Sequence, residues 1–542
     1  MTERAAGSEE RSAGAREGAG AAVRPRAGAQ ARTGGSAAAG VVAAGHPRSA
    51  QAGAEALRAG GNAVDAALAA MATSFAAEPL LTGLGAGGYM LVVPGDGPAW
   101  PGPERAPVLL DFFVEVPGRG ADRARRSELV PVSVSFGDAV QVFNAGAASV
   151  GTYGMPRGIC AAAERFGRIP LAELVAPAAA LARAGVPLNA EQAYVVEILE
   201  GIVRLTPGVE AVYAPEGRLL AAGDPLRQPE LAATLELLAA EGARPFYEGE
   251  VAAAAVAALA EQGGLVTAAD LAAYAAVERA PVRAAYRGRE VLSNPPPSAG
   301  GTLIAYALAL LERAPEAAAD GPGGPSARRL VAAMDASQAE RTPAFLDGLA
   351  QEGFLDAFLA ARLGSTTHVS VLDGDGGACS VTCSNGEGAG VVVPGTGIHL
   401  NNMLGEQDLN PLGFHRFPPG RRLPSMMAPT VVLGDGRPEL VLGSAGSNRI
   451  RSAVLQTIVA VVDHGMSADE AVRAPRLHFE DGIVYAEPGA DVDALERDGH
   501  TIARFRARNL FFGGVQAVER DPVSGALSGG GDPRRGGAAV VA

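Results

Sequence analysis

Two adjacent runs of alternating apolar and polar residues lie in the C-terminal part of the chain. Val369 and Val371 alternate with polar neighbours, residues 373–377 consist of Asp and Gly alone, and residues 378–384 form the second run. A period of two is typical of strands, and a short Asp/Gly segment between two such runs is typical of a turn. The pattern therefore predicts a β-hairpin.

The turn suggests a register for this hairpin. If Leu372 faces Ala378, Thr366 at the start of the first strand faces Ser384 at the end of the second. A slip of one residue would turn every side chain to the other face, so the register is an assumption that a structure tests.

Other elements are expected on both sides of the hairpin. Residues 391–393 and a second hairpin within 430–442 have strand character, and an apolar helix is expected over residues 449–463. Upstream, residues 49–59 and most of 160–285 have an Ala- and Leu-rich helical pattern that Pro and Gly interrupt. Strands and helices in this arrangement fit an α+β fold of the αββα type.

Two glycine-containing segments near the N-terminus invite a functional interpretation. Asn62, followed three residues later by Asp65, predicts the N-cap of a helix, so a structural role for Asp65 is favoured over a catalytic one. Residues 83–88 are similar to a dinucleotide-binding fingerprint, but a helical pattern rather than a strand precedes them. No cofactor is therefore expected.

Thr366 is a candidate nucleophile because a threonine hydroxyl can use its own α-amino group as a base. That group becomes available once the preceding peptide bond is cut, and its ordinary pKa of about 8 suits proton transfer near neutral pH. Two threonines at the start of a strand are also common for structural reasons alone, so the local pattern leaves both interpretations open.

Composition narrows the possible chemistry. The 542 residues are 48% hydrophobic and carry a net charge of −14, which argues against a nucleic-acid or anionic-membrane surface. The chain contains no lysine, which excludes a lysine Schiff base, a Ser-Lys dyad and a Walker-type phosphate loop. Cys160, Cys379 and Cys383 form no CxxC motif and the histidines lack metal-ligand spacing, so neither a disulfide framework nor a metal site is expected.

The first 40 residues lack the apolar core of a signal peptide, and we expect them to form a disordered tail. No apolar stretch elsewhere is long enough to span a bilayer. A cytoplasmic location is therefore expected, with export as the alternative if the start codon is misassigned.

Seven motifs in the same order give the chain a strong resemblance to the γ-glutamyltransferase (γ-glutamyltranspeptidase) family of N-terminal-nucleophile hydrolases. They lie at residues 43–47, 60–67, 83–88, 295–301, 366–368, 400–402 and 443–446. The resemblance implies a four-layer αββα sandwich that is cleaved between Ser365 and Thr366. The segments 41–365 and 366–542 would then be the large and small subunits.

The resemblance also implies roles for individual residues. Thr366 would be the nucleophile, Ser384 would orient it, and Gly446 and Ser447 would supply the oxyanion hole. Substrate-binding positions of the family correspond to Phe113, Asn385, Asn402, Glu406 and Ser425.

Three of the family's glutamyl-binding positions are altered in this chain. Phe113 stands where the family has an arginine that binds a carboxylate, Met426 replaces a serine, and Met403 replaces a glutamine. An apolar ring cannot replace a bidentate guanidinium. We therefore expect a divergent acyl pocket unless another cation compensates, with Arg421, Arg422 and Arg449 as the candidates.

Three functions remain open from the sequence. The first is γ-glutamyl hydrolysis or transfer, the second is an acylase activity on other amides of the cephalosporin-acylase kind, and the third is a scaffold that does not mature. For an enzyme, the partners would be a small amide and water or an amine acceptor. The two fragments would form a heterodimer, or a dimer of such heterodimers.

Overall fold

The computed structural model describes residues 38–542 except 79, 99, 123, 125, 137–139, 314–325, 340–366 and 411–412. All described residues belong to one compact unit, which spans residues 37–542. Ser365 and Thr366, and with them the predicted cleavage site, lie outside the described residues.

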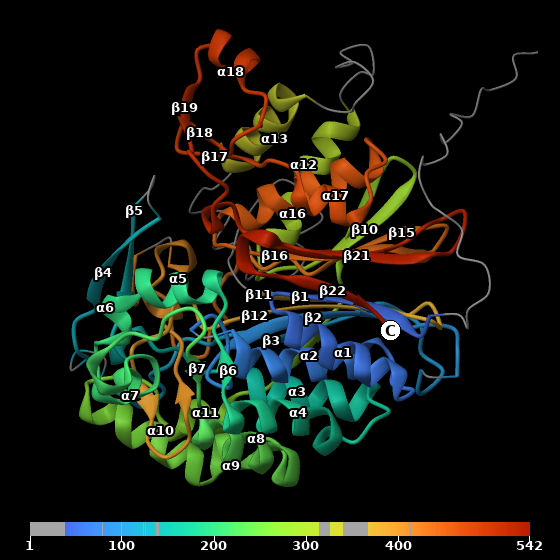
Figure 1. Ribbon diagram of the computed structural model, residues 1–542. Coiled ribbons are helices and arrows are strands. Elements are labelled where there is room, and N and C mark those ends of the chain that lie inside the picture. The colour runs from blue at the N-terminus through green and yellow to red at the C-terminus, as the bar shows by residue number, and fades with distance from the viewer. Residues whose placement is uncertain are drawn as a thin grey trace, which may run out of the picture. The chain divides into compact units, whose positions relative to one another are not determined.

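Two antiparallel sheets form the centre of this unit (Figure 1). The first has the strand order β22 (Ala538–Val541), β1 (Gly40–Ala44), β11 (Thr367–Asp373), β12 (Ala378–Ser384), β2 (Gly87–Val93), β3 (Val108–Phe112) and β8 (Val277–Arg279). The second has the order β21 (Leu527–Gly531), β20 (Gly514–Arg520), β16 (Arg437–Ala445), β15 (Thr430–Gly434), β10 (Arg289–Ser293) and β9 (Val282–Tyr286).

Helices cover the outer face of each sheet (Figure 1). The first sheet is covered by α1 (Pro47–Arg58), α2 (Ala63–Ala77) and α3 (Met155–Phe166), with α4 (Leu171–Ala184) and α8 (Pro229–Glu241) outside α2. The second is covered by α12 (Gly300–Arg313), α16 (Arg449–Val462) and α17 (Ala468–Arg473), with α13 (Ala327–Ala339) against α12. The predicted four-layer αββα sandwich is confirmed.

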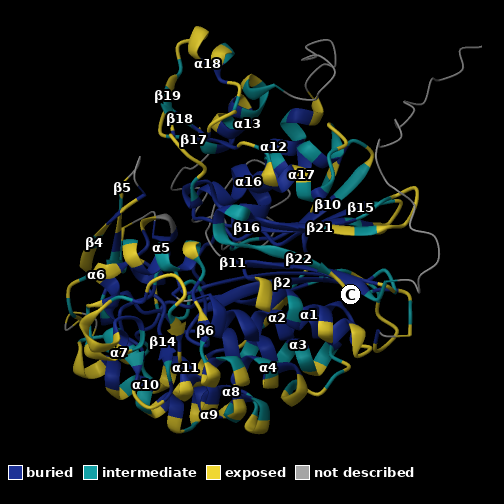
Figure 2. Ribbon diagram, in the orientation of Figure 1, coloured by how far each residue is buried: buried dark blue, intermediate teal, exposed yellow. Residues whose placement is uncertain are grey.

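Each interface between layers has its own apolar core. Side chains such as Val41, Leu91, Leu372 and Val441 fill the space between the two sheets. Both central strands of the predicted hairpin, β11 and β12, are buried along their whole length (Figure 2). Strands buried on both faces place any chemistry at their ends, where the chain emerges from the core.

The start of α2 shows how the sequence sets a helix boundary. Asn62 is its N-cap, and its side chain accepts hydrogen bonds from the backbone N–H of Val64 and Asp65. The Asp65 carboxylate in turn accepts from the backbone N–H of Asn62. This reciprocal capping box confirms the structural role expected for Asp65.

The remaining elements surround this sandwich. The helices are α5 (Ala190–Ile198), α6 (Glu200–Val203), α7 (Pro207–Tyr213), α9 (Arg244–Glu248), α10 (Glu250–Glu261), α11 (Ala268–Ala273) and α18 (Asp493–Arg497). The small sheets pair β4 (Val130–Ser135) with β5 (Val140–Ala145), β6 (Val186–Pro187) with β7 (Pro225–Leu226), β13 (Val392–Val393) with β14 (Ile398–His399), and β18 (Ile483–Ala486) with both β17 (Leu477–Glu480) and β19 (Thr501–Arg504).

Candidate active site

The β11–β12 hairpin has the register that the sequence predicts. Leu372 faces Ala378 and Thr367 faces Cys383. Strand β12 continues for one residue beyond that last pair, to Ser384, which faces Gly87 of β2. If the register continued by one residue, Ser384 would face position 366, which lies outside the described residues.

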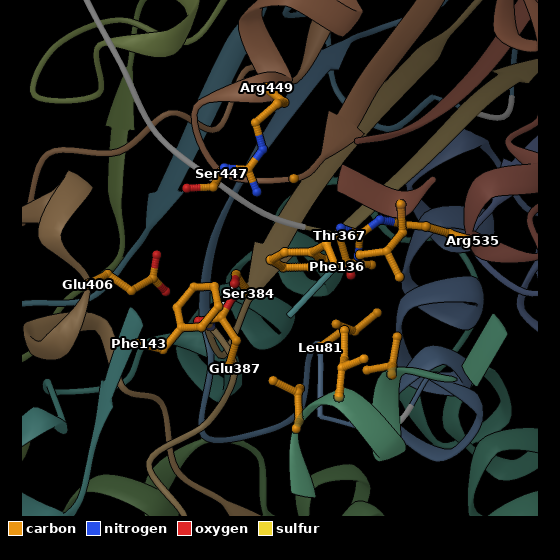
Figure 3. A pocket seen from close by; sticks show the side chains of 16 residues that line it. Leu81, Phe136, Phe143, Thr367, Ser384, Glu387, Glu406, Ser447, Arg449 and Arg535 are labelled. Atoms are coloured by element: carbon orange, nitrogen blue, oxygen red, sulfur yellow. Dashed lines mark hydrogen bonds between the residues drawn. The ribbon is translucent and has the colours of Figure 1, made fainter. Parts of the chain in front are cut away.

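Ser384 lies at the end of a buried strand and on the wall of a cavity (Figure 3). Its hydroxyl oxygen accepts a hydrogen bond of 2.7 Å from the backbone N–H of Gly386. That bond fixes the direction of the oxygen's lone pairs and leaves the hydroxyl proton available to a second group. Ser384 is therefore suited to orienting another hydroxyl at the cavity wall.

The loop from Gly446 to Asn448 joins strand β16 to helix α16. Pairing of β16 with β20 ends at Ala445, and α16 begins at Arg449, so the loop's N–H groups lie outside both regular elements. Gly446 has a φ of +117°, and a Cβ there would lie 2.6 Å from Cα of Gly513. Ser447 also has a left-handed backbone, with a φ of +53°. This tight turn aims the loop at the cavity, and both residues line it.

A buried polar network supports this loop from behind. Asn448 donates a side-chain hydrogen bond to Glu480, and the Nε of Arg451 donates to the backbone carbonyl of Asn448 at 3.2 Å. His478 lies 3.3 Å from Glu480 and 2.8 Å from the Ser452 hydroxyl.

Neighbouring groups determine the ionisation state of Glu480 in this network. Burial alone would raise the pKa of Glu480, but the His478 hydrogen bond and the nearby Arg449 and Arg451 lower it to about 2. Glu480 therefore stays ionised and holds Asn448 in place.

The cavity has an empty volume of about 600 Å³, including the solvent at its mouth. One part of its lining is apolar and consists of Leu81, Phe136, Phe143, Val195, Ile198, Leu199 and Leu510. The rest is polar or charged and consists of Thr367, Ser384, Gly386, Glu387, Glu406, Gly446, Ser447, Arg449 and Arg535. Figure 3 shows them around the cavity: Thr367 and Ser384 lie at the ends of β11 and β12, and Arg449 is the first residue of α16.

Glu387 is an acid of the cavity wall whose pKa is raised. Burial raises its pKa to about 7, against the opposing effects of a hydrogen bond with Asn402 and the charges of Arg449 and Arg535. Its Oε2 atom is buried and makes no hydrogen bond with any residue that the structure describes. A carboxyl group in this state can gain or lose a proton near neutral pH.

The predicted substrate-binding residues are only partly brought together. Glu406 lines the cavity, and the side-chain oxygen of Asn402 accepts from the backbone N–H of Glu387 at 3.0 Å. Asn385 is buried and donates to the His399 carbonyl at 3.0 Å. Ser425 is fully buried, and its hydroxyl accepts from the backbone N–H of Met427. Neither Asn385 nor Ser425 is part of the cavity lining.

Phe113 does not lie in the cavity lining either. Its side chain is fully buried in the core between the sheets and stacks on Tyr89, with 5.3 Å between ring centroids. It directly follows β3, where the chain faces the second sheet rather than the cavity. The expected contact of this ring with a substrate therefore has no support in the geometry.

The three arginines proposed as substitutes for the missing cation lie in different parts of the structure. Arg422 is buried near Asp111 and Glu115, at 3.4 and 3.7 Å, and Arg421 lies over the Phe417 ring. Arg449 does line the cavity. Its Nε donates to the Phe511 carbonyl at 3.0 Å and its guanidinium stacks on the same residue's ring. Of the three, only Arg449 lines the cavity.

His368, beside the candidate nucleophile in sequence, lies between the two sheets. Its ring nitrogens are each 2.8 Å from a hydroxyl, Nδ1 from Thr382 and Nε2 from Ser370. Burial lowers the pKa of His368 to about 3, so the ring is neutral at ordinary pH. It ties strands together and is not placed to act as a base in the cavity.

Sequence reasoning missed Phe136, Phe143 and Arg535 as cavity residues. The two phenylalanines come from the β4–β5 hairpin. Its valines, such as Val132, Val134 and Val142, alternate with other residues, and this period of two could have predicted the hairpin. Arg535 had no comparable signal, because the position of a chain end in the fold depends on long-range pairing.

Within the described ranges, no group of three His, Cys, Asp or Glu side chains is arranged to hold a metal ion. In the same part of the chain, no helix is long and apolar enough to cross a bilayer.

Comparison with known proteins gives a consistent result. A family model described as "Gamma-glutamyltranspeptidase" matches residues 49–353 and 350–542. The "Acylase ACY 1 proenzyme" of Pseudomonas sp. (strain SE83) is 34% identical over 523 residues, covering 90% of this chain and 91% of that protein. The "Glutathione hydrolase proenzyme" of Escherichia coli (strain K12) is 32% identical over 552 residues, covering 91% and 90%.

A solved structure extends this likeness to three dimensions. The cephalosporin acylase from Bacillus halodurans superimposes with a TM-score of 0.78 at 26% identity, and the match covers 95% of this chain and 99% of that one. The relatives therefore include both hydrolases named for glutathione and acylases.

Proposed function

Because the chain belongs to the γ-glutamyltranspeptidase family of N-terminal-nucleophile hydrolases, we propose that it is a self-processing amidohydrolase or acyltransferase whose nucleophile is Thr366. The observation that carries this proposal is the register of the β11–β12 hairpin. Continued by one residue beyond the Thr367–Cys383 pair, this register would place Thr366 opposite Ser384, which lines a cavity together with Gly446 and Ser447.

Maturation would begin with an attack of Thr366 Oγ on the carbonyl carbon of Ser365. The peptide C–N bond breaks, an ester forms to Oγ, and the Thr366 nitrogen becomes a free amine. Water then hydrolyses the ester, leaving a carboxylate on Ser365 and a free hydroxyl on Thr366. No external oxidant, metal or cofactor enters this balance.

The mature residue would use its new α-amine as the base. The amine takes the hydroxyl proton while Oγ attacks the substrate's amide carbon, and Ser384 keeps the hydroxyl in the attacking orientation. Negative charge develops on the amide oxygen, where the N–H groups of Gly446 and Ser447 would stabilise it. One such donor is typically worth about 3 kcal/mol of barrier.

The leaving amine departs with the proton, and the acyl group remains on Thr366 as an ester. Attack by water completes hydrolysis, whereas attack by another amine completes transfer. Both outcomes use the same residues, so the accessible acceptor decides between them.

An acylase activity on non-glutamyl amides is the second candidate, and the lining of the cavity favours it. Seven of its residues are apolar side chains, among them Phe136 and Phe143. Such a wall stabilises an aliphatic acyl chain by about 25 cal/mol for each Å² removed from water. The alternative of a non-maturing scaffold would make no use of this cavity.

The test is a denaturing gel followed by hydrolysis of γ-glutamyl, glutaryl and pentanoyl p-nitroanilides. The proposal predicts two bands for the purified protein and release of nitroaniline from at least one substrate. A single full-length band with no release would establish the scaffold alternative. The ratio of rates on the three substrates separates glutamyl transfer from the acylase activity.

A further inference from the structure

The Arg535 side chain is a cation on the wall of the proposed catalytic cavity. Arg535 follows Arg534, whose guanidinium pairs with Glu487 and Asp532 and donates to the carbonyls of Val472 and Ala474. The Arg535 side chain forms no hydrogen bond or ion pair within the part of the chain that the structure describes, and its Nε is buried. The two adjacent arginines therefore differ. The Arg534 guanidinium is paired within the fold, whereas the Arg535 guanidinium faces the cavity without a direct partner among the described residues.

The Arg535 guanidinium is charged at neutral pH. Burial lowers its pKa, and the nearby Asp532, Glu387 and Glu78 oppose that effect, leaving the pKa at about 10. These carboxylates act on it only through space, since none forms an ion pair with it. A partly buried charge without a direct partner is costly, and a bound anion would remove that cost.

The other cation of the cavity is already used. Arg449 donates to Phe511 and lies 3.3 to 3.4 Å from the side-chain oxygen of Gln141. Figure 3 shows Arg449 and Arg535 approaching the cavity from different elements. Arg535 is thus the better placed of the two to accept a new ligand.

The neighbouring acids indicate which kind of anion fits. Glu387 and Glu406 line the same cavity, and two acidic groups would repel a doubly charged phosphate more strongly than a singly charged carboxylate. A guanidinium presents a planar fork of donors that matches a carboxylate. The apolar wall, with Phe136 and Phe143, suits the aliphatic or aromatic part of the same molecule.

We propose that Arg535 is a specificity-determining residue that binds a carboxylate of the amide substrate. Arg535 would provide the cationic contact for a substrate carboxylate that Phe113, an apolar side chain buried in the core, does not provide. The inference rests on the proposed amidohydrolase function and adds the substrate class, an amide that carries a carboxylate. That carboxylate belongs either to the acyl group or to the leaving amine.

Three anilides distinguish the two sources. Glutaryl p-nitroanilide carries the carboxylate on the acyl group, pentanoyl carboxy-p-nitroanilide carries it on the leaving group, and pentanoyl p-nitroanilide carries none. Each is assayed with the mature wild type, Arg535→Met and Arg535→Lys. Arg437→Met is the matched control, because Arg437 is an exposed arginine at the start of β16, outside the cavity lining.

Arg535→Met is expected to lower kcat/KM for one of the two anionic anilides by about 100-fold, as when one partner of a desolvated charge pair is removed. The neutral anilide should change by less than about threefold, and Arg535→Lys should recover part of the loss. The affected substrate identifies the source of the carboxylate. Equal losses on all three substrates, or no loss on either anionic one, would overturn the inference.

Calorimetry keeps the inference testable if the wild type cleaves none of the anilides, a result that would count against the proposed function. Glutarate and aminonitrobenzoate are titrated into the wild type and into Arg535→Met. Tighter binding of either anion to the wild type supports the Arg535 subsite without any catalysis. Equal binding to both proteins, or none to either, contradicts it.

Discussion

At the scale of single residues, the backbone conformation of Ser447 is the most informative feature. Its φ of +53° is a left-handed conformation that costs a residue with a Cβ about 1 kcal/mol relative to glycine. The turn nevertheless retains this conformation, because Gly446 beside it is pressed against Gly513 and α16 starts two residues later. The loop therefore stores strain at the point where an oxyanion would be bound.

Replacing Ser447 by glycine is expected to release that strain. Ser447→Gly should raise the free energy of unfolding in urea by about 1 kcal/mol, whereas Ser447→Ala, which keeps the Cβ, should not raise it. The N–H group remains in both variants. A glycine variant no more stable than the alanine variant would show that the left-handed turn is unstrained.

Glu387 makes carboxylate binding sensitive to pH. Its pKa is raised to about 7, so the group is neutral below that pH and ionised above it. Ionisation adds a negative charge near Arg535 and weakens the attraction of the cavity for an anion. For the anionic anilide that depends on Arg535, the wild-type preference over the neutral pentanoyl anilide should therefore fall between pH 6 and pH 8.

The Glu387→Gln variant provides the control for this prediction. Its substrate preference should stay constant across the same pH range, since the amide does not titrate. Using a ratio of two substrates cancels the titration of the nucleophile's amine, which affects both. A wild-type ratio that rises with pH would mean that another group governs the cavity's charge.

Single residues also show where sequence reasoning fails. The family resemblance identifies Phe113 as a substituted substrate-binding position, but it gives no direction for the side chain, which points into the core between the sheets. Arg535 is invisible to pattern analysis, because its exposure to the cavity results from long-range strand pairing near the C-terminus. The register of the β11–β12 hairpin, in contrast, is predicted correctly from Leu372–Ala378 to Thr367–Cys383, because a turn and a period of two determine it.

Among the secondary-structure elements, the β4–β5 hairpin gives the cavity its aromatic character. Phe136 follows β4 and Phe143 lies on β5, and both side chains are buried. Val142, next to Phe143, is 52% exposed on the opposite face of the strand. The alternation of β5 thus separates a cavity face from a solvent face.

Phe143→Ala is expected to reduce the preference for longer acyl chains. The kcat/KM for pentanoyl p-nitroanilide should fall about tenfold relative to acetyl p-nitroanilide, because a short acyl group does not reach the ring's apolar surface. Val142→Ala is the matched control and should leave the ratio unchanged. Equal losses on both substrates in Phe143→Ala would indicate a damaged fold rather than a lost contact.

Strands and helices that adjoin a recognisable turn sequence could be predicted from the sequence, whereas short strands without such a turn could not. The hairpins at 367–384 and 430–445 and helix α16 follow from Asp/Gly turns and apolar periodicity. Strands β1 and β22 are short and Ala/Val-rich, so they resemble helical or irregular sequence until they pair with each other. Tertiary pairing decides such segments.

For the whole molecule, the two predicted subunits are interleaved rather than adjacent. Strand β1, from the first segment, lies between β11 and β22, both from the second. In the other sheet, β10 of the first segment pairs with β15 of the second. This strand order explains how a cut chain would stay together.

Cleavage is therefore expected to leave the fragments associated. The mature protein should elute in native size-exclusion chromatography at the same volume as the uncut Thr366→Ala precursor, and its fragments should separate only in denaturant. Dissociation under native conditions would contradict a shared core.

The central claim is that Thr366 becomes the N-terminal nucleophile, and intact mass spectrometry of the denatured protein tests it most directly. The wild type should yield two chains whose masses correspond to residues 1–365 and 366–542, while Thr366→Ala should yield one uncut chain. A brief reaction with an acyl anilide should add the mass of the acyl group to the smaller chain alone. Cleavage at another bond, cleavage in Thr366→Ala, or acylation of the larger chain would contradict the account.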